Sequence, residues 1–247
     1  MSIKSGRVWE LDFIRGVAVL VMIFIHMNYT LTTFFGVNIF SGALDMESIV
    51  MAVMEYGGAV FIVISGICSC YSKNNLKRGL NLFFIAMLLT YATLIIQTYI
   101  IPGSQTLITF GILHCLSVLM IIGHFLLKIP QIKYVTNFIY LVLGAAIIIA
   151  GYILRSNDIS FPVLFGYQIS EIIPSADYFP LIPFLGWFII GIFIGKTFYL
   201  KGRLLARSKR AGGFLPIRGV SFVGRHSLIF YLVHQPVIYI VCTLFAV

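Results

Sequence analysis

The chain has 247 residues, of which 60% are hydrophobic and only 10% are charged, and its mean hydropathy is +1.02. A soluble domain has about 25% charged residues, so this composition argues against a soluble globular domain or a disordered chain and indicates a membrane protein. The net charge of +9 would suggest a nucleic-acid partner, but the placement of the basic residues points to the lipid bilayer instead.

Seven apolar segments of about 20 residues, the length that crosses a bilayer, follow one another along the chain. They lie at residues 9–34, 47–71, 78–101, 106–128, 133–154, 179–200 and 222–246. No stretch between them is long enough to bury a core of its own, so we expect one integral-membrane domain over residues 1–247. The predicted fold is all-α, a polytopic membrane protein with seven transmembrane helices.

Charges in the connecting segments predict the orientation of these helices. If the N-terminus is cytoplasmic, every basic residue except Arg15 and Arg155 falls at a cytoplasmic helix end. The acidic residues that fall at outer ends are Asp45, Glu47, Asp158, Glu171 and Asp177. This is the positive-inside distribution, so we expect a cytoplasmic N-terminus and an extracytoplasmic C-terminus. The basic run at residues 201–219 then lies near anionic lipid and has no role in binding nucleic acid.

The first apolar segment contains Asp12, Arg15 and His26, within "ELDFIRGVAVLVMIFIHMN" at residues 10–28. Asp12 and Arg15 are three residues apart and can pair on one helix face. Arg15 and His26 are separated by about 20° beyond three full turns, so they share a face and stand about 16 Å apart along the axis. Ionisable groups inside a membrane mark candidate functional sites. The alternatives are a structural Asp12–Arg15 pair with a snorkelling arginine, and an interfacial histidine.

Two further histidines, His114 and His234, fall well inside the predicted helices, whereas His124 and His226 lie near cytoplasmic helix ends. His114 lies about 12 Å below the outer end of the fourth segment, and His234 lies about 12 Å above the cytoplasmic start of the seventh near Arg225. With His26 they occupy the outer half to the middle of the bilayer. Each could equally be a structural histidine whose hydrogen bonds are satisfied within the protein.

Five stretches of the sequence together resemble a known family. They are "LDFIRGVAVLVMIFIHMN", "FIVISGICSC", "FGILHCL", "DYFPLIPFLGWFIIGIFIG" and "GRHSLIFYLVHQPV", in that order. The chain resembles the bacterial members of the heparan-α-glucosaminide N-acetyltransferase catalytic-domain family, within the transmembrane acyltransferase superfamily. Arg15 and His26 fit the Arg-x10-His pattern of that superfamily. The resemblance implies a multi-pass protein of a bacterial cell membrane, with His26 as the catalytic candidate and Arg15 supporting the acyl donor.

The resemblance also implies a reaction, in which an acetyl or other acyl group passes from cytoplasmic acyl-CoA to a sugar or glycan on the far side of the membrane. Acyl transfer needs a base or nucleophile at the acceptor and hydrogen-bond donors for the developing oxyanion. We expect His26 to act as the base or to carry the acyl group transiently. We expect His114 or His234 to orient His26 or the thioester carbonyl.

The donor side of the site is predicted at the cytoplasmic ends of the helices. Lys77 and Arg78 open the third segment there, and basic side chains suit the phosphates of acetyl-CoA. Arg15, paired with Asp12, lies just above them in the predicted topology. No set of Cys and His residues has the spacing of zinc ligands, so no metal is expected.

Two other functions compete with an acyltransferase. Membrane-embedded His, Asp and Arg groups also serve proton relays, so a proton-coupled transporter or permease is the first alternative. A catalytically inactive membrane scaffold is the second. The sequence leaves open the acceptor, the acyl chain and a homo-oligomeric state.

Overall fold

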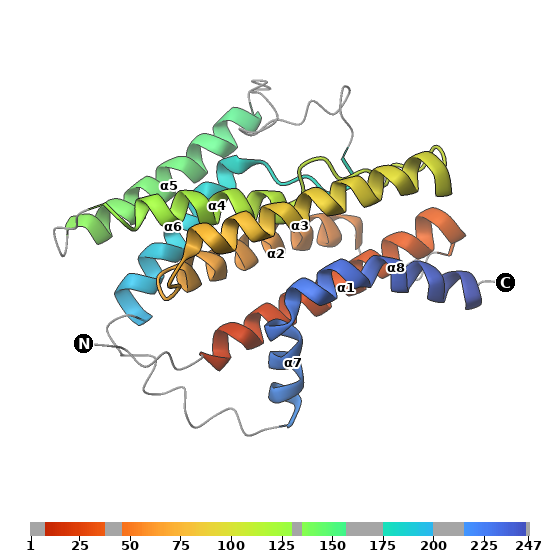
Figure 1. Ribbon diagram of the computed structural model, residues 1–247, viewed down its shortest axis with the longest axis horizontal. Coiled ribbons are helices and arrows are strands. Elements are labelled where there is room, and N and C mark those ends of the chain that lie inside the picture. The colour runs from red at the N-terminus through yellow and green to blue at the C-terminus, as the bar shows by residue number, and fades with distance from the viewer. Residues whose placement is uncertain (1–7, 38–45, 130–134, 157–174, 200–214, 246–247) are drawn as a thin grey trace. The chain divides into compact units, whose positions relative to one another are not determined.

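The computed structural model describes residues 8–37, 46–129, 135–156, 175–199 and 215–245 (Figure 1). These residues form helices, and no β-strand occurs among them. The predicted basic run lies outside the described residues over positions 201–214. The elements are α1 (Trp9–Phe35), α2 (Met46–Ser69), α3 (Asn75–Ile95) with the π-helical turn η1 (Ile96–Ile100), α4 (Ile112–Leu126), α5 (Val135–Ser156), α6 (Leu181–Ile194) with the π-helical turn η2 (Gly195–Tyr199), α7 (Leu215–Arg225) and α8 (Ser227–Phe245).

Within the part of the chain that the structure describes, five helical stretches are long and apolar enough to cross a membrane. They are Trp9–Phe35, Asn75–Ile100, Asn137–Leu154, Leu181–Tyr199 and Ser227–Phe245. Two more apolar helical stretches, Tyr56–Ser69 and Ile112–Leu126, are shorter. The prediction of an all-helical, multi-pass membrane protein is therefore confirmed. That all seven helices cross the bilayer, with the N-terminus inside and the C-terminus outside, stays a prediction.

The chain divides into two compact units. Unit 1 covers Met1–Phe61 and Leu204–Val247, so it holds α1, the first part of α2, α7 and α8. Unit 2 covers Ile62–Arg203 and holds the end of α2 with α3 to α6 and both π-helical turns. Each unit is described by itself below. The single domain expected over residues 1–247 stays a prediction.

In unit 1, α8 runs beside α1 and the short helix α7 crosses α1 (Figure 1). Glycine makes the crossing possible, because a Cβ atom on Gly16 would collide with the backbone carbonyl of Val220. On α7, a Cβ atom on Gly224 would collide with the carbonyl of Asp12. The two helices therefore touch backbone to backbone at two points one turn apart on each helix.

The seventh predicted segment, 222–246, is two helices in the structure, with the break at His226. His226 is the turn residue between them. Its Nδ1 lies 3.0 Å from the carbonyl oxygen of Phe222, one turn back, and its backbone N–H also donates to Phe222. Its own carbonyl accepts from the N–H groups of Ile229 and Phe230, in the first turn of α8.

Glycines also bring the helices of unit 2 together. A Cβ atom on Gly66 of α2 would strike the carbonyl of Phe188 on α6, and one on Gly191 would strike the carbonyl of Val63. Phe188 and Ile192 are completely buried at this contact. The helices α5 and α6 also pack backbone to backbone, because a Cβ atom on Gly144 would lie against the carbonyl of Gly186 and one on Gly186 against the carbonyl of Gly144.

The helix α4 begins at Ile112, several residues later than the predicted start at residue 106. The preceding segment instead lies along α3, whose side chains bond its backbone. Gln97 accepts from the N–H of Leu107 at 2.9 Å, and Thr93 accepts from the N–H of Ile108 at 3.2 Å. These side chains satisfy the backbone N–H groups of a segment that is not helical.

The close contact of α1 with α7 yields a stability prediction. Substituting Gly224→Ala places a methyl group against the backbone of Asp12, which no rotamer change relieves. We expect the unfolding free energy to fall by about 1–3 kcal/mol, the usual cost of overpacking. The matched control is Gly219→Ala on the same helix, where the added methyl has no neighbour within 4 Å. Thermal unfolding of both variants in detergent micelles measures the difference, and equal unfolding temperatures would contradict the packing described here.

Candidate functional site

The charged pair of the first helix is formed as expected. A guanidinium nitrogen of Arg15 lies 3.3 Å from a carboxylate oxygen of Asp12, and their side chains are only 18% and 10% exposed. The guanidinium also lies 5.9 Å from the centre of the Phe61 ring. A mostly buried ion pair is held in place by its surroundings more firmly than a surface pair is.

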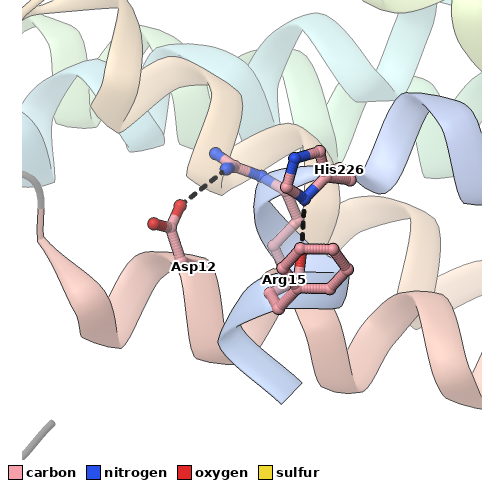
Figure 2. A network of polar contacts seen from close by, with 4 residues as sticks. Asp12, Arg15 and His226 are labelled. Carbon is pink, nitrogen blue, oxygen red and sulfur yellow. Dashed lines mark hydrogen bonds and ion pairs between the residues drawn. The ribbon is translucent and has the colours of Figure 1, made fainter. Parts of the chain in front are cut away.

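The α1–α7 crossing provides those surroundings. Gly224 packs on the backbone of Asp12, so the end of α7 lies directly against the turn that carries the ion pair. Figure 2 shows Asp12 and Arg15 on α1 together with His226, the residue that follows α7. The arginine is therefore fixed at a helix crossing.

Further along α1, His26 meets His234 of α8. The ring centroids are 5.0 Å apart and the rings are nearly perpendicular, at 85°. The sequence placed both residues in the same part of the bilayer, and the structure brings them into edge-to-face contact.

The hydrogen bonds of these two rings define their proton positions. Nδ1 of His26 lies 2.9 Å from the carbonyl oxygen of Met22, and Nδ1 of His234 lies 2.6 Å from that of Tyr231. A carbonyl oxygen only accepts, so each Nδ1 carries the proton. Each neutral ring therefore presents a lone pair on Nε2, as a general base requires.

The region around His234 holds further acceptor atoms. Gln235 donates from Nε2 to the hydroxyl of Thr30 across the α1–α8 contact at 3.1 Å. Its Oε1 and the Nε2 of His234 are buried, and neither has a hydrogen-bond partner among the described residues. Buried acceptors without partners are costly, so this place is suited to a ligand that brings O–H or N–H groups.

The third histidine has a different environment, in unit 2. His114 is 2% exposed, and both ring nitrogens are engaged within the protein. Nδ1 accepts from the backbone N–H of Gly111 at 3.3 Å, so Nε2 carries the proton and donates to Thr90 at 3.2 Å. The Thr90 hydroxyl in turn donates a hydrogen bond to the carbonyl of Ile108 at 2.7 Å. This geometry is that of a structural histidine, and the catalytic role predicted for His114 stays a prediction.

The segment before α6 completes the surroundings of His114, and sequence reasoning missed its role. Asp177 accepts from the N–H of Ile112 at 3.1 Å and so caps the start of α4, where a negative charge is favourable. The next residue, Tyr178, pairs with Phe110 by a parallel backbone bridge. Burial raises the pKa of Tyr178 to about 12, so its phenol stays protonated at neutral pH.

The predicted donor-binding residues of α3 lie at its first turn. Lys77 and Arg78 are both exposed, and the side chain of Asn74 caps the helix by accepting from the N–H of Lys77 at 2.9 Å. A helix N-terminus with two exposed cationic side chains attracts phosphate groups. These residues belong to unit 2, whereas Asp12, Arg15, His26 and His234 belong to unit 1.

Within the described ranges, no group of three or more His, Cys, Asp or Glu side chains is placed to hold a metal ion. The side chains that meet at the α1–α8 contact offer imidazole, amide and hydroxyl groups.

Several apolar helices of membrane-spanning length indicate a polytopic membrane protein. The chain matches the family described as "Heparan-alpha-glucosaminide N-acetyltransferase, catalytic" over residues 7–236. It belongs to this family of N-acetyltransferase catalytic domains, which confirms the resemblance seen in the sequence. No curated protein and no solved structure matches the chain.

The hydrogen bonds of His114 yield a second prediction. In Thr90→Val the ring N–H of His114 and the carbonyl of Ile108 each lose a partner inside the protein. We expect the unfolding free energy to fall by about 1–3 kcal/mol, because buried polar groups are left unpaired. Thr243→Val is the control, since Thr243 is exposed and bonds only the carbonyl one turn back. Thermal unfolding should separate the two valine variants, and equal stability would mean that the Thr90 network contributes nothing.

Proposed function

We propose that this chain is a transmembrane acetyltransferase that moves an acetyl group from acetyl-CoA on the cytoplasmic side to an amino group or hydroxyl of a sugar on the other side. Family membership supports acetyl transfer, and the apolar helices support a site within the membrane. The acceptor is proposed as a sugar by analogy with the family description, without the assumption that it is heparan.

The observation that carries the proposal is the His26–His234 pair. The two imidazole rings contact each other at 5.0 Å, and each uses Nδ1 to bond a backbone carbonyl. In the neutral form, each ring therefore has a lone pair on Nε2. A base for an acceptor hydroxyl or amine must have such a lone pair at the reacting atom. Next to it, the unpaired Oε1 of Gln235 offers a further acceptor for the several O–H and N–H groups of a sugar.

In the proposed step, Nε2 of His26 takes the proton from the attacking O–H or N–H group. The new C–O or C–N bond forms at the thioester carbonyl, the C–S bond breaks, and the proton is returned to the departing CoA thiolate. Nε2 of His234 accepts a hydrogen bond from a second donor of the same acceptor and so holds it in position. Because Nδ1 of His234 is occupied by a carbonyl, its neutral ring cannot donate to the oxyanion.

The donor is proposed to bind through cations. Arg15 shares a helix with His26, and because α1 is continuous from Trp9 to Phe35 the two lie about 16 Å apart along it. In unit 2, the exposed Lys77 and Arg78 at the start of α3 suit the phosphates of CoA. We assign Arg15, kept in place by Asp12, and the Lys77–Arg78 pair to the donor.

The direct test uses inside-out membrane vesicles with labelled acetyl-CoA outside and glucosamine inside. We expect His26→Gln to lower label transfer by about 10²-fold or more, the usual contribution of a general base. The control is His124→Gln. His124 is half-buried and has no assigned role, so this variant should transfer as much label as the parent does. Equal label transfer by the His26 variant and the control would overturn the assignment of His26.

A second experiment separates the two histidines of the pair. His234→Gln removes a lone pair that is proposed to hold the acceptor, not the reacting proton. We therefore expect a higher KM for glucosamine with a smaller loss of kcat than in the His26 variant. Initial rates over a range of glucosamine concentrations measure both constants. If kcat falls as far in His234→Gln as in His26→Gln, the roles are shared or reversed.

A further inference from the structure

At one end of unit 2, four side chains have polar atoms that are buried and have no hydrogen-bond partner among the described residues. The atoms are Oη of Tyr71, Oδ1 of Asn75, Nζ of Lys196 and Oγ1 of Thr197. They come from the segment after α2, the first residue of α3 and the turn η2. We call these four residues the Lys196 cluster.

Printed contacts join the three segments that carry the cluster. Nδ2 of Asn75 donates to the carbonyl of Ser69 at 2.8 Å, which ties the start of α3 to the end of α2. The thiol of Cys70 lies 3.6 Å from the carbonyl of Ile192, which ties the same end of α2 to the last turn of α6. The rings of Tyr71 and Tyr199 are 6.4 Å apart in T-shaped contact, so the segment after α2 also meets η2.

Lys196 is the member that most needs explaining. It is 8% exposed, and its ammonium nitrogen lies 4.7 Å from the centre of the Tyr140 ring. The ring face offers some compensation for a buried cation but gives the N–H groups no acceptor. A buried lysine without an anionic partner is rare in proteins, because removing its hydration is costly.

A lysine with only a structural role would place its ammonium group differently. At a membrane interface a long basic side chain extends its head group into water, as snorkelling residues do. Lys196 does not reach water, and its neighbours Tyr71 and Thr197 also keep unpaired hydroxyls buried. Three donors thus remain unpaired in one neighbourhood, together with a single acceptor, the amide oxygen of Asn75.

We propose that the Lys196 cluster is a binding site for a phosphate ester that carries a neighbouring hydroxyl group. The ammonium group and the two side-chain hydroxyls match the charge and the several acceptor oxygens of a phosphate. The Asn75 oxygen accepts from the hydroxyl, and the N-terminus of α3, at which Asn75 stands, adds positive potential.

Two molecules at a membrane share this chemistry. One is the ribose 3′-phosphate of CoA, which stands beside the ribose 2′-hydroxyl, and for that ligand the inference rests on the proposed function. The other is the head group of a glycerol-bearing anionic lipid such as phosphatidylglycerol. The cluster is distinct from the exposed Lys77 and Arg78, because its polar atoms are buried.

The test uses the full chain in nanodiscs and two lysine variants. Lys196→Met removes the buried cation at similar volume, and Lys128→Met removes an exposed lysine just after α4 as the matched control. Thr197→Val serves as a second variant if Lys196→Met does not fold. Binding of CoA and of 3′-dephospho-CoA is measured in phosphatidylcholine discs, and the unfolding temperature is measured with and without phosphatidylglycerol.

If CoA is the ligand, the parent and Lys128→Met bind CoA at least tenfold more tightly than 3′-dephospho-CoA, and Lys196→Met loses that preference. If the lipid is the ligand, phosphatidylglycerol raises the unfolding temperature of the parent and of Lys128→Met but not of Lys196→Met. A Lys196→Met protein that responds as the parent does in both assays overturns the proposal. Because neither readout requires acetyl transfer, a parent that passes these tests but transfers no label refutes the proposed function alone.

Discussion

A polar side chain on an apolar helix has to find its hydrogen bond within the protein, and several of the described side chains use a carbonyl about one turn back. His26, His226 and Ser69 all bond the carbonyl of the residue four positions earlier, and His234 bonds the one three positions earlier. This hydrogen-bonding pattern has a chemical consequence for the imidazoles. A ring whose Nδ1 is committed to a carbonyl keeps its Nε2 as an acceptor, so the helix backbone itself sets the protonation pattern on which the proposed base depends.

The same constraint distinguishes the histidines by the hydrogen-bonding capacity that each ring has left. His114 donates to Thr90 and accepts from Gly111, so its ring has no capacity left for a ligand. His234 uses one nitrogen for the backbone and leaves the other buried and unpaired. Spacing along the sequence could not distinguish these two residues, because the difference lies in partners contributed by an irregular segment and by a neighbouring helix.

Much of the architecture was predictable because apolar length and charge placement are strong signals. The helices, the Asp12–Arg15 pair and the common face of Arg15 and His26 all follow from the 3.6-residue period. The family was recognisable from five short stretches. The break at His226 and the late start of α4 were not predictable, because hydropathy does not register where an apolar segment is interrupted. The late start of α4 accompanies side chains that bond backbone groups of the preceding segment. The row of Thr90, Thr93 and Gln97, three to four residues apart on α3 and η1, was the available signal for it.

The burial of Lys196 was also not predictable from the sequence. By the positive-inside rule it was one more topogenic charge at a cytoplasmic helix end, and that rule concerns only which side of the membrane a residue occupies. Burial of the amine beside Tyr140 depends on how η2 meets α5, which no local pattern encodes. Unpaired atoms in the two units also differ in kind: acceptors predominate beside His234, and donors predominate beside Lys196. Acceptors suit a ligand rich in hydroxyl or amino groups, and donors suit an anion, so hydrogen-bond complementarity assigns the two sites to different ligand groups before any ligand is known.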